Sequence, residues 1–382
     1  MAVVRDRWAD VVSGDVTLEG EVYEIVDQRG IQQSVRLKTG PGRETIQVHM
    51  NGYPIVRIGD RIAIACELEG VQGLRVDGFR YDRYLMKERV LALCRTYASP
   101  LIVGTTPSWR TKLFISRDRM ERALQRSLHE PHASLLIGLL YGARSTLPDN
   151  IQEEFRRSGT MHIVAVSGYN VMLVSIALML PLSIVMRRQY SLTIVLFCIG
   201  GFVVLAGGDA AVVRAAVMGS LVLVARHIGR PSSSPALLLL AATVMTMIEP
   251  RLLLDDAGFH LSFAAAAGLI WLAPYIRARL KGFPRRVQGI LSETTAATIM
   301  TAPILWLQFG QMSLVAPWSN LFVLPLIPYA VGSGLFAMIG SVIAQTLSLD
   351  WLGVALAMPA YVILDLMLML IHLFAALPWI ST

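Results

Sequence analysis

One arginine stands inside an otherwise apolar stretch of the sequence, where a positive charge needs a physical reason. Arg214 follows the apolar run Ala210–Val213. A charged side chain inside a bilayer is costly, so it marks either a functional site or an ion pair. Two hypotheses follow. Arg214 lines a path for an anion, or it forms a structural ion pair with Asp209 or Asp365.

Small polar residues recur at helical spacing before and after this arginine. Ser167 and Asn170 share one helical face with Val174 by the i, i+3, i+7 rule, so they either line a pore or hydrogen-bond between helices. A second polar stripe is expected along one face of the segment 290–309, at Thr294, Thr298, Thr301 and Gln308.

Prolines interrupt two of the apolar segments. Pro303 frees a backbone carbonyl beside the polar stripe, which is tolerated where water or a neighbouring helix satisfies it. Asn320 precedes Pro325 and Pro328, which we expect to break one segment into two half-helices. We predict that Asn320 lines a cavity there.

Enzymatic and metal chemistry find little support in the sequence. Asp255, Asp256 and His260 could bind a cation, but one histidine near two carboxylates is a weak metal signal, and His260 is also a candidate for lining the pore. A Ser167–His260 pair could serve an intramembrane hydrolase, although nothing orients the histidine. Neither a GxxxxGK[ST] phosphate loop nor an HxHxDH motif is present, so we expect no catalysis, no cofactor, and a motor on another protein.

The composition shows which elements must position these residues. Hydrophobic residues make up 54% of the 382, mean hydropathy is +0.55, and 16% are charged. From residue 161 onward there are 11 Lys/Arg and 7 Asp/Glu, which excludes a purely soluble enzyme, a coiled coil and a disordered chain. A span needs about 20 mainly apolar residues. The sequence therefore predicts an α-helical polytopic bundle of about eight spans, at 162–186, 190–206, 210–226, 235–249, 257–276, 290–309, 315–344 and 351–379.

The first hundred residues have a different pattern. Short alternating runs separated by turn residues predict five strands and a small OB-fold-like β-barrel, with strands at 15–26, 34–38, 45–50, 61–68 and 74–79. Such barrels often bind single-stranded nucleic acids through basic and aromatic side chains. The candidates are Arg36, Lys38, Arg75 and Tyr81, which would otherwise be ordinary solvated residues. Segment 107–130 predicts a basic amphipathic helix, lying on a membrane surface or packed on the barrel.

Loop charge and cysteine usage bear on location. Basic loops alternate with acidic or neutral ones, which places residues 1–160 outside the cytoplasm. Met1–Gly20 contains no apolar signal segment, so the chain is expected to be a fragment or one piece of a split gene. Cys66 and Cys94 could pair in an oxidising compartment, but we expect unpaired, partly buried thiols; the remaining cysteine is Cys198.

Four segments carry a family resemblance, at 134–171, 207–219, 255–274 and 302–328. They resemble ComEC-type competence proteins, and the resemblance covers about residues 15–382. It implies an external OB-fold-like domain (1–100), linker helices (101–160) and a channel domain (161–382). The family's N-terminal spans and metallo-β-lactamase-like domain have no counterpart here. Asn170 stands where the family usually has histidine, so a role that needs imidazole is in doubt there.

The resemblance also implies a function. It is a channel in the bacterial inner membrane that brings single-stranded DNA into the cytoplasm during natural transformation. The implied partners are single-stranded DNA, membrane lipids, DNA-receptor proteins and a separate cytoplasmic ATP-driven motor, with a homo-oligomer left open. A transporter of another, smaller solute is the alternative, and an intramembrane hydrolase is a third.

Overall fold

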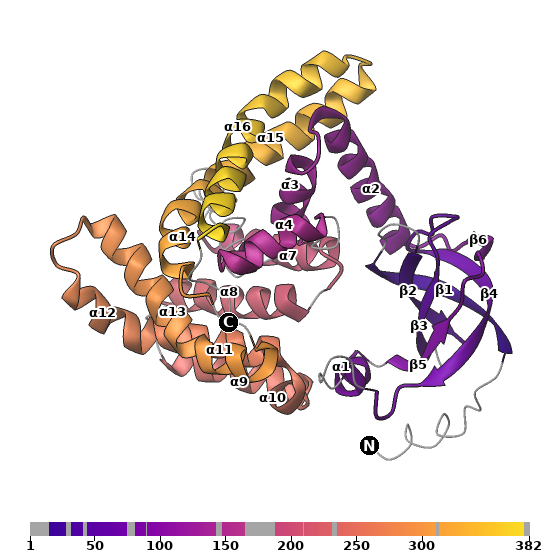
Figure 1. The fold of residues 1–382 in the computed structure, drawn as a ribbon, viewed down its shortest axis with the longest axis horizontal. Coiled ribbons are helices and arrows are strands. Elements are labelled where there is room, and N and C mark those ends of the chain that lie inside the picture. The colour runs from indigo at the N-terminus through magenta and orange to yellow at the C-terminus, as the bar shows by residue number, and fades with distance from the viewer. Residues whose placement is uncertain are drawn as a thin grey trace. The chain divides into compact units, whose positions relative to one another are not determined.

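The chain divides into two compact units, which are described separately. The first comprises Met1–Arg117 and the second Asp118–Thr382. The structure is a computed structural model, drawn in Figure 1. It describes residues 15–27, 32–40, 44–74, 81–88, 90–142, 147–164, 188–208, 210–230, 235–310 and 313–377.

The first unit is built from strands. They are β1 (Asp15–Asp27), β2 (Gln32–Thr39), β3 (Glu44–Asn51), β4 (Asp60–Gly70), β5 (Val90–Arg95) and β6 (Leu101–Thr105), with one short helix, α1 (Tyr81–Lys87). The first four agree with the sequence prediction to within a few residues. The predicted strand 74–79 is not seen, because Leu74 lies outside any strand and 75–80 lie outside the described residues. The next strand is β5, whose run VLALCR lacks the alternation that was sought.

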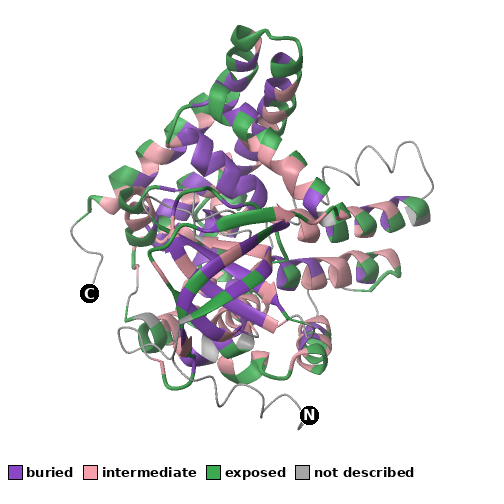
Figure 2. Cartoon of the chain, turned by 90° about the vertical axis from the view of Figure 1, so that its right-hand side faces the viewer, coloured by how far each residue is buried: buried purple, intermediate pink, exposed green. Residues whose placement is uncertain are grey.

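The strand pairing connects β1, β2, β3, β5 and β4 in a closed cycle. β1 pairs with β2 and β4, β2 with β3, and β5 with β3 and β4. The β3–β5 pair is parallel and the others are antiparallel. β6 pairs with β4 at an edge. The register of β1 shifts between Val22 and Glu24, and such bulges let a long strand bend. Buried residues alternate with more exposed ones along β4, whereas β2 and β3 are buried over most of their length. Most of the buried apolar side chains of the strands form one core (Figure 2).

A disulfide joins Cys66 on β4 to Cys94 on β5, so the expectation of unpaired thiols was wrong. The β4–β5 register sets Cys94 opposite Leu68, which leaves Cys66 diagonal to it on the same face with a Cα–Cα distance of 5.7 Å. That distance suits a disulfide. The sequence could not reveal this adjacency, because β5 had not been predicted.

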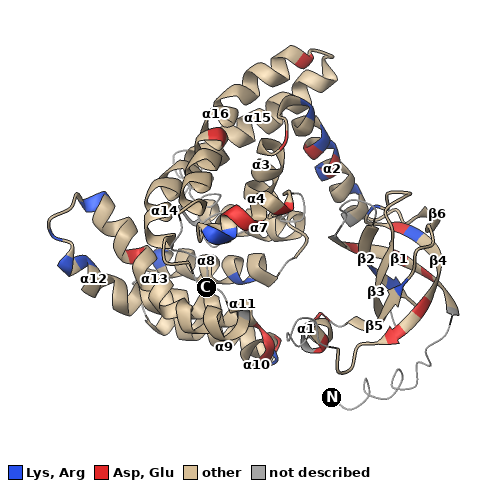
Figure 3. Cartoon of the chain, in the orientation of Figure 1, with Lys and Arg blue, Asp and Glu red and all other residues tan. Residues whose placement is uncertain are grey.

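The second unit is helical. Its helices are α2 (Trp109–Ser127, which contains the boundary), α3 (His132–Tyr141), α4 (Asp149–Arg157), α5 (Met161–Val164), α7 (Arg188–Leu205), α8 (Ala210–His227), α9 (Pro235–Ile248), α10 (Leu252–Asp255), α11 (Ala257–Ala267), α12 (Ala273–Arg279), α13 (Arg285–Phe309), α14 (Ala316–Val323), α15 (Ile327–Thr346) and α16 (Asp350–Ala375). A large apolar core joins α3 and α4 to α15 and α16. Charged residues are frequent on α2 and sparse on α15 and α16 (Figure 3).

Five helical stretches are long and apolar enough to cross a membrane. They are Ala210–His227, Ala257–Arg279, Arg285–Gln308, Ala316–Thr346 and Asp350–Ala375. Each matches a predicted span. The predicted spans 190–206 and 235–249 correspond to helices shorter than that limit. The predicted span 162–186 lies mostly outside the described residues, so eight spans are not established.

Two of the long stretches contain a local change of helix type. A π-helical turn at Gly268–Leu272 joins α11 to α12, just before Pro274, whose nitrogen has no proton to donate. A 3-10 turn at Leu324–Leu326 joins α14 to α15 around Pro325. The prolines thus change the winding without separating two half-helices. Where we expected Pro325 and Pro328 to break the segment, the structure has a 3-10 turn and the helix continues.

Candidate polar sites among the apolar helices

Arg214 forms a buried ion pair with Asp256. Its guanidinium Nη1 lies 3.0 Å from the Asp256 carboxylate Oδ2, and both side chains are less than a tenth exposed. Asp256 also caps α11, because its Oδ1 accepts a hydrogen bond from the backbone N–H of Phe259 at 3.2 Å. The arginine on α8 therefore connects to the start of α11.

The partner of Arg214 differs from both acids considered in the sequence. Asp209 lies outside the described residues, and Asp365 instead faces His132. From the sequence, Asp256 was predicted as a possible cation ligand. The sequence therefore identified both charged residues but did not predict that they pair. The two are 42 positions apart and meet only when α8 and α11 pack.

Gly258 gives the Arg214 guanidinium its space. A Cβ at this position would lie 2.5 Å from Nη2 of Arg214 and 3.1 Å from Oδ1 of Asp256. Such close approaches require the neighbouring groups to shift. A side chain here, in the first turn of α11, would displace the end of Arg214 from its position in the ion pair.

We expect Gly258→Ala to weaken the ion pair and destabilise the protein by about 1–3 kcal/mol, the usual cost of overpacking. Thermal unfolding of the purified protein in detergent measures this effect. Gly332→Ala on α15 is the matched control, because a Cβ there meets nothing within 4 Å. Equal unfolding temperatures for Gly258→Ala and the wild type would contradict this account of the site.

His260, predicted as a possible cation ligand with Asp255 and Asp256, uses one ring nitrogen to contact the backbone. Its Nε2 lies 2.7 Å from the backbone oxygen of Leu253, so this nitrogen carries the proton and donates it. This contact occupies Nε2 alone. Ser167, the other half of the predicted pair, lies outside the described residues together with Asn170, so the pair stays a prediction. Among the described residues, no cluster of three His, Cys, Asp or Glu could hold a metal ion.

The predicted stripe on α13 is only partly a polar surface. The Thr301 hydroxyl donates a hydrogen bond to the backbone oxygen of Ala297 at 2.8 Å, so its donor is used within α13. Thr294 is buried, Thr298 is half-buried and Gln308 is exposed. No described contact joins these side chains to Arg214.

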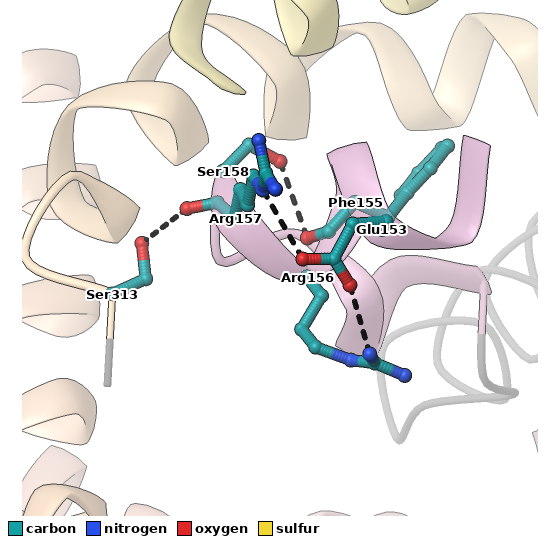
Figure 4. Close-up of polar contacts among 6 residues, drawn as sticks. All are labelled: Glu153, Phe155, Arg156, Arg157, Ser158 and Ser313. Carbon is teal, nitrogen blue, oxygen red and sulfur yellow. Dashed lines mark hydrogen bonds and ion pairs between the residues drawn. The ribbon is translucent and has the colours of Figure 1, made fainter. Parts of the chain in front are cut away.

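A polar junction links the end of α4 to α14 and to the segment just before it; its Ser319–Ser158 contact is buried and its Ser313–Arg157 contact is exposed. Ser319 donates its hydroxyl to the backbone oxygen of Ser158 at 2.6 Å, and Ser313 donates to that of Arg157 at 2.8 Å. Figure 4 shows the second contact beside the ion pairs that Arg156 and Arg157 make with Glu153. These bonds satisfy carbonyls that a helix end leaves without partners.

Asn320 lies next to this junction. It is 3% exposed, and its Oδ1 has no hydrogen-bond partner within the described part of the chain. Gly159, with φ of +72°, brings the chain so close to α14 that a Cβ would lie 2.5 Å from that of Ala316. The structure therefore joins two of the segments that carry the sequence resemblance, 134–171 and 302–328.

The residues of the first unit that were predicted to contact DNA differ in how far they are buried. Arg36 is 2% exposed and pairs with Glu24 at 2.8 Å and Glu88 at 3.2 Å, so its prediction as a surface contact was wrong. The alternation of β2 could not reveal this, because five successive residues of the strand are buried. Arg75 lies outside the described residues.

Lys38 and Tyr81 remain partly accessible. The Lys38 ammonium lies 4.6 Å from the centroid of the Tyr23 ring, within cation–π range. Burial, with a smaller contribution from Glu24, raises the pKa of the Tyr23 phenol above its ordinary value, so the ring stays neutral beneath the lysine. The Tyr81 hydroxyl accepts a hydrogen bond from Gln47 at 3.2 Å.

A β-sheet unit followed by long apolar helices with a few buried polar residues defines an integral membrane protein with an N-terminal β-sheet region. Residues 139–382 match the competence protein family, and the chain belongs to it. The match covers the helical unit from the last turn of α3 onward.

Two curated relatives are similar to this chain. ComE operon protein 3 of Bacillus subtilis (strain 168) is 24% identical over 288 residues, covering 72% of this chain and 35% of the relative. Competence protein ComA of Neisseria gonorrhoeae is 24% identical over 361 residues, covering 90% of this chain and 50% of the relative. The chain thus spans half or less of the length of these relatives. No solved structure matches it.

Proposed function

We propose that this protein is a channel through which single-stranded DNA enters the bacterial cytoplasm during natural transformation. The observation that carries the proposal is the family match, which spans the helical unit and includes all five candidate spans. Buried polar side chains in these helices, Arg214 and Asn320 among them, suit a hydrated path for an anion. The partner is single-stranded DNA, with a separate ATP-driven motor and receptor proteins.

We place the first unit outside the cytoplasm, as the loop charges predict, and the helices in the inner membrane. The Cys66–Cys94 disulfide supports this placement, because disulfides persist in oxidising compartments and are rare in the cytosol. A cyclic pairing of five strands supports an OB-fold-like barrel. Partly accessible Lys38 and Tyr81 are the contacts that we retain for a DNA strand.

Loss of the protein should abolish the entry of labelled DNA into the cytoplasm, while DNA still binds at the cell surface. Fluorescent DNA tests this, with nuclease protection separating internal from surface-bound strands. A strain complemented with the wild-type gene is the control. Normal cytoplasmic entry in the deletion strain would overturn the proposal, whereas loss of surface binding as well would assign the protein an earlier step.

A further inference from the structure

A carboxylate and an imidazole meet near the middle of the most apolar candidate span. Asp365 lies on α16 (Asp350–Ala375), whose most apolar 18-residue window has a mean hydropathy of 2.3, the highest of the five. Its Oδ1 is 3.1 Å from Nε2 of His132 on α3. Residue 365 is the sixteenth of 26, so the pair lies within about 5 Å of the helix midpoint along its axis.

The histidine is enclosed and incompletely hydrogen-bonded. His132 is 8% exposed, and its Nδ1 is buried without a partner within the described part of the chain. The ring of Tyr361 lies against it, with a centroid separation of 4.4 Å. This contact and Asp365 fix the ring from two sides. Whichever tautomer is present, Nδ1 is left as an unmatched donor or acceptor, a position that a water molecule would complete.

Asp365 is the accessible member of the pair, since its side chain is 60% exposed. A charged carboxylate is poorly solvated by hydrocarbon, so an exposed acid within an apolar helix needs a polar partner or water. His132 is the partner that the structure gives Asp365, and the exposed side of the carboxylate leaves it open to water as well.

A second pair of the same kind lies two turns further along α16. His372 Nδ1 is 3.2 Å from the Glu154 carboxylate of α4. Tyr361, Asp365 and His372 are spaced by four and seven residues, so they share one face of the helix. The pairs are about 10 Å apart along the axis, a gap that water would have to bridge.

Within the described part of the chain, α4 also places Asp149 and Glu153 among the helices packed against α16, and Glu153 pairs with Arg156 and Arg157 of its own helix. α14 and α15, the remaining neighbours of α16, contain no Asp, Glu, His, Lys or Arg. On α16 itself the one further acid is Asp350, at the first residue. Among the described residues, the acids and histidines that contact each other across this face of α16 are therefore His132, Asp365, Glu154 and His372.

We propose that the His132–Asp365 pair is a proton-transfer site within the membrane part of this protein. A proton from water binds the Asp365 carboxylate and passes to Nε2 of His132, which acts as an acceptor in that tautomer. The proton on Nδ1 then leaves to a water molecule. Net charge is conserved, and the ring ends in its other tautomer. Rotation of the ring or a returning proton resets the site.

The full chain reconstituted in lipid vesicles containing a pH-sensitive dye tests this site without any DNA, so the result is separate from that for the channel. After an external acid jump, the wild type should acidify the vesicle interior faster than empty vesicles do. Asp365→Asn should reduce the protein-dependent rate at least tenfold. Asp350→Asn, the same change at the end of the same helix, should leave it unchanged.

His132→Gln is the second variant, because glutamine still donates a hydrogen bond to Asp365 but cannot exchange a proton. His132→Gln should lose proton flux to the same extent as Asp365→Asn. If Asp365→Asn does not fold, the result for His132→Gln decides whether the pair transfers protons. Asp365→Glu should retain measurable flux. A wild-type rate equal to that of empty vesicles, or wild-type flux in either neutral variant, would overturn the proposal, as would an equal loss in Asp350→Asn.

Discussion

Arg214→Ala is expected to destabilise the protein by about 3–5 kcal/mol, because it leaves the buried Asp256 carboxylate without its counter-ion. Thermal unfolding in detergent should show a lower midpoint than the wild type, and DNA entry should fall in cells that carry the variant. Lys281→Ala, which removes an exposed charge from the loop after α12, is the control and should change neither measurement.

Asp256→Asn separates the two interpretations of this arginine. Asparagine still caps α11 but removes the negative charge, so Arg214 becomes the uncompensated group. If the Arg214–Asp256 pair acts by holding α8 to α11, the Asp256→Asn and Arg214→Ala proteins should lose similar amounts of stability. The double variant Arg214→Met/Asp256→Asn should then recover much of the loss, because it leaves no buried charge.

A different result would move Arg214 from a structural role to the transport path. If Arg214→Ala unfolds at the wild-type temperature and still blocks DNA entry, its charge acts on the transported strand. Folded Asp256→Asn, which keeps that charge, would then still admit DNA. Protein levels measured in the same cells distinguish lost transport from lost protein.

Breaking the Cys66–Cys94 disulfide is expected to cost about 3–4 kcal/mol, from the chain entropy that a loop of this length releases in the unfolded state. The double variant Cys66→Ala/Cys94→Ala should lower the unfolding midpoint of the first unit, followed through its β-sheet signal. A reductant should lower the wild-type midpoint by a similar amount and leave the variant unchanged.

Cys198→Ala is the matched control, since Cys198 is the free cysteine among the described residues. It should not alter the response to reductant. If the wild-type protein purified from cells carries three reactive thiols, the bond does not form in the cell. The placement of the first unit outside the cytoplasm would then lose its structural support.

The sequence predicted the elements better than the contacts between them. Hydropathy located the long helices, and alternation located four strands, because both depend on local patterns. Arg36 illustrates the limit: its burial between Glu24 and Glu88 depends on residues 12 and 52 positions away. The pairing of Arg214 with Asp256 is of the same kind. The His132–Asp365 pair, 233 positions apart, had no local signal beyond an acid in an apolar run.

The winding change at Leu324–Leu326 has a consequence for how the protein fits a bilayer. Ala316–Thr346 is helical throughout, with 31 residues. At about 1.5 Å per α-helical residue and 2.0 Å per 3-10 residue, it is about 48 Å long. A hydrocarbon layer is about 30 Å thick, so full immersion would need a tilt of about 50°, beyond the usual range of up to about 40°. A straight helix within the usual range of tilt would therefore extend at one end into the headgroup layer. The exposed Trp318 on α14 suits that boundary, which would make membrane thickness a determinant of how α14 sits over the junction with α4.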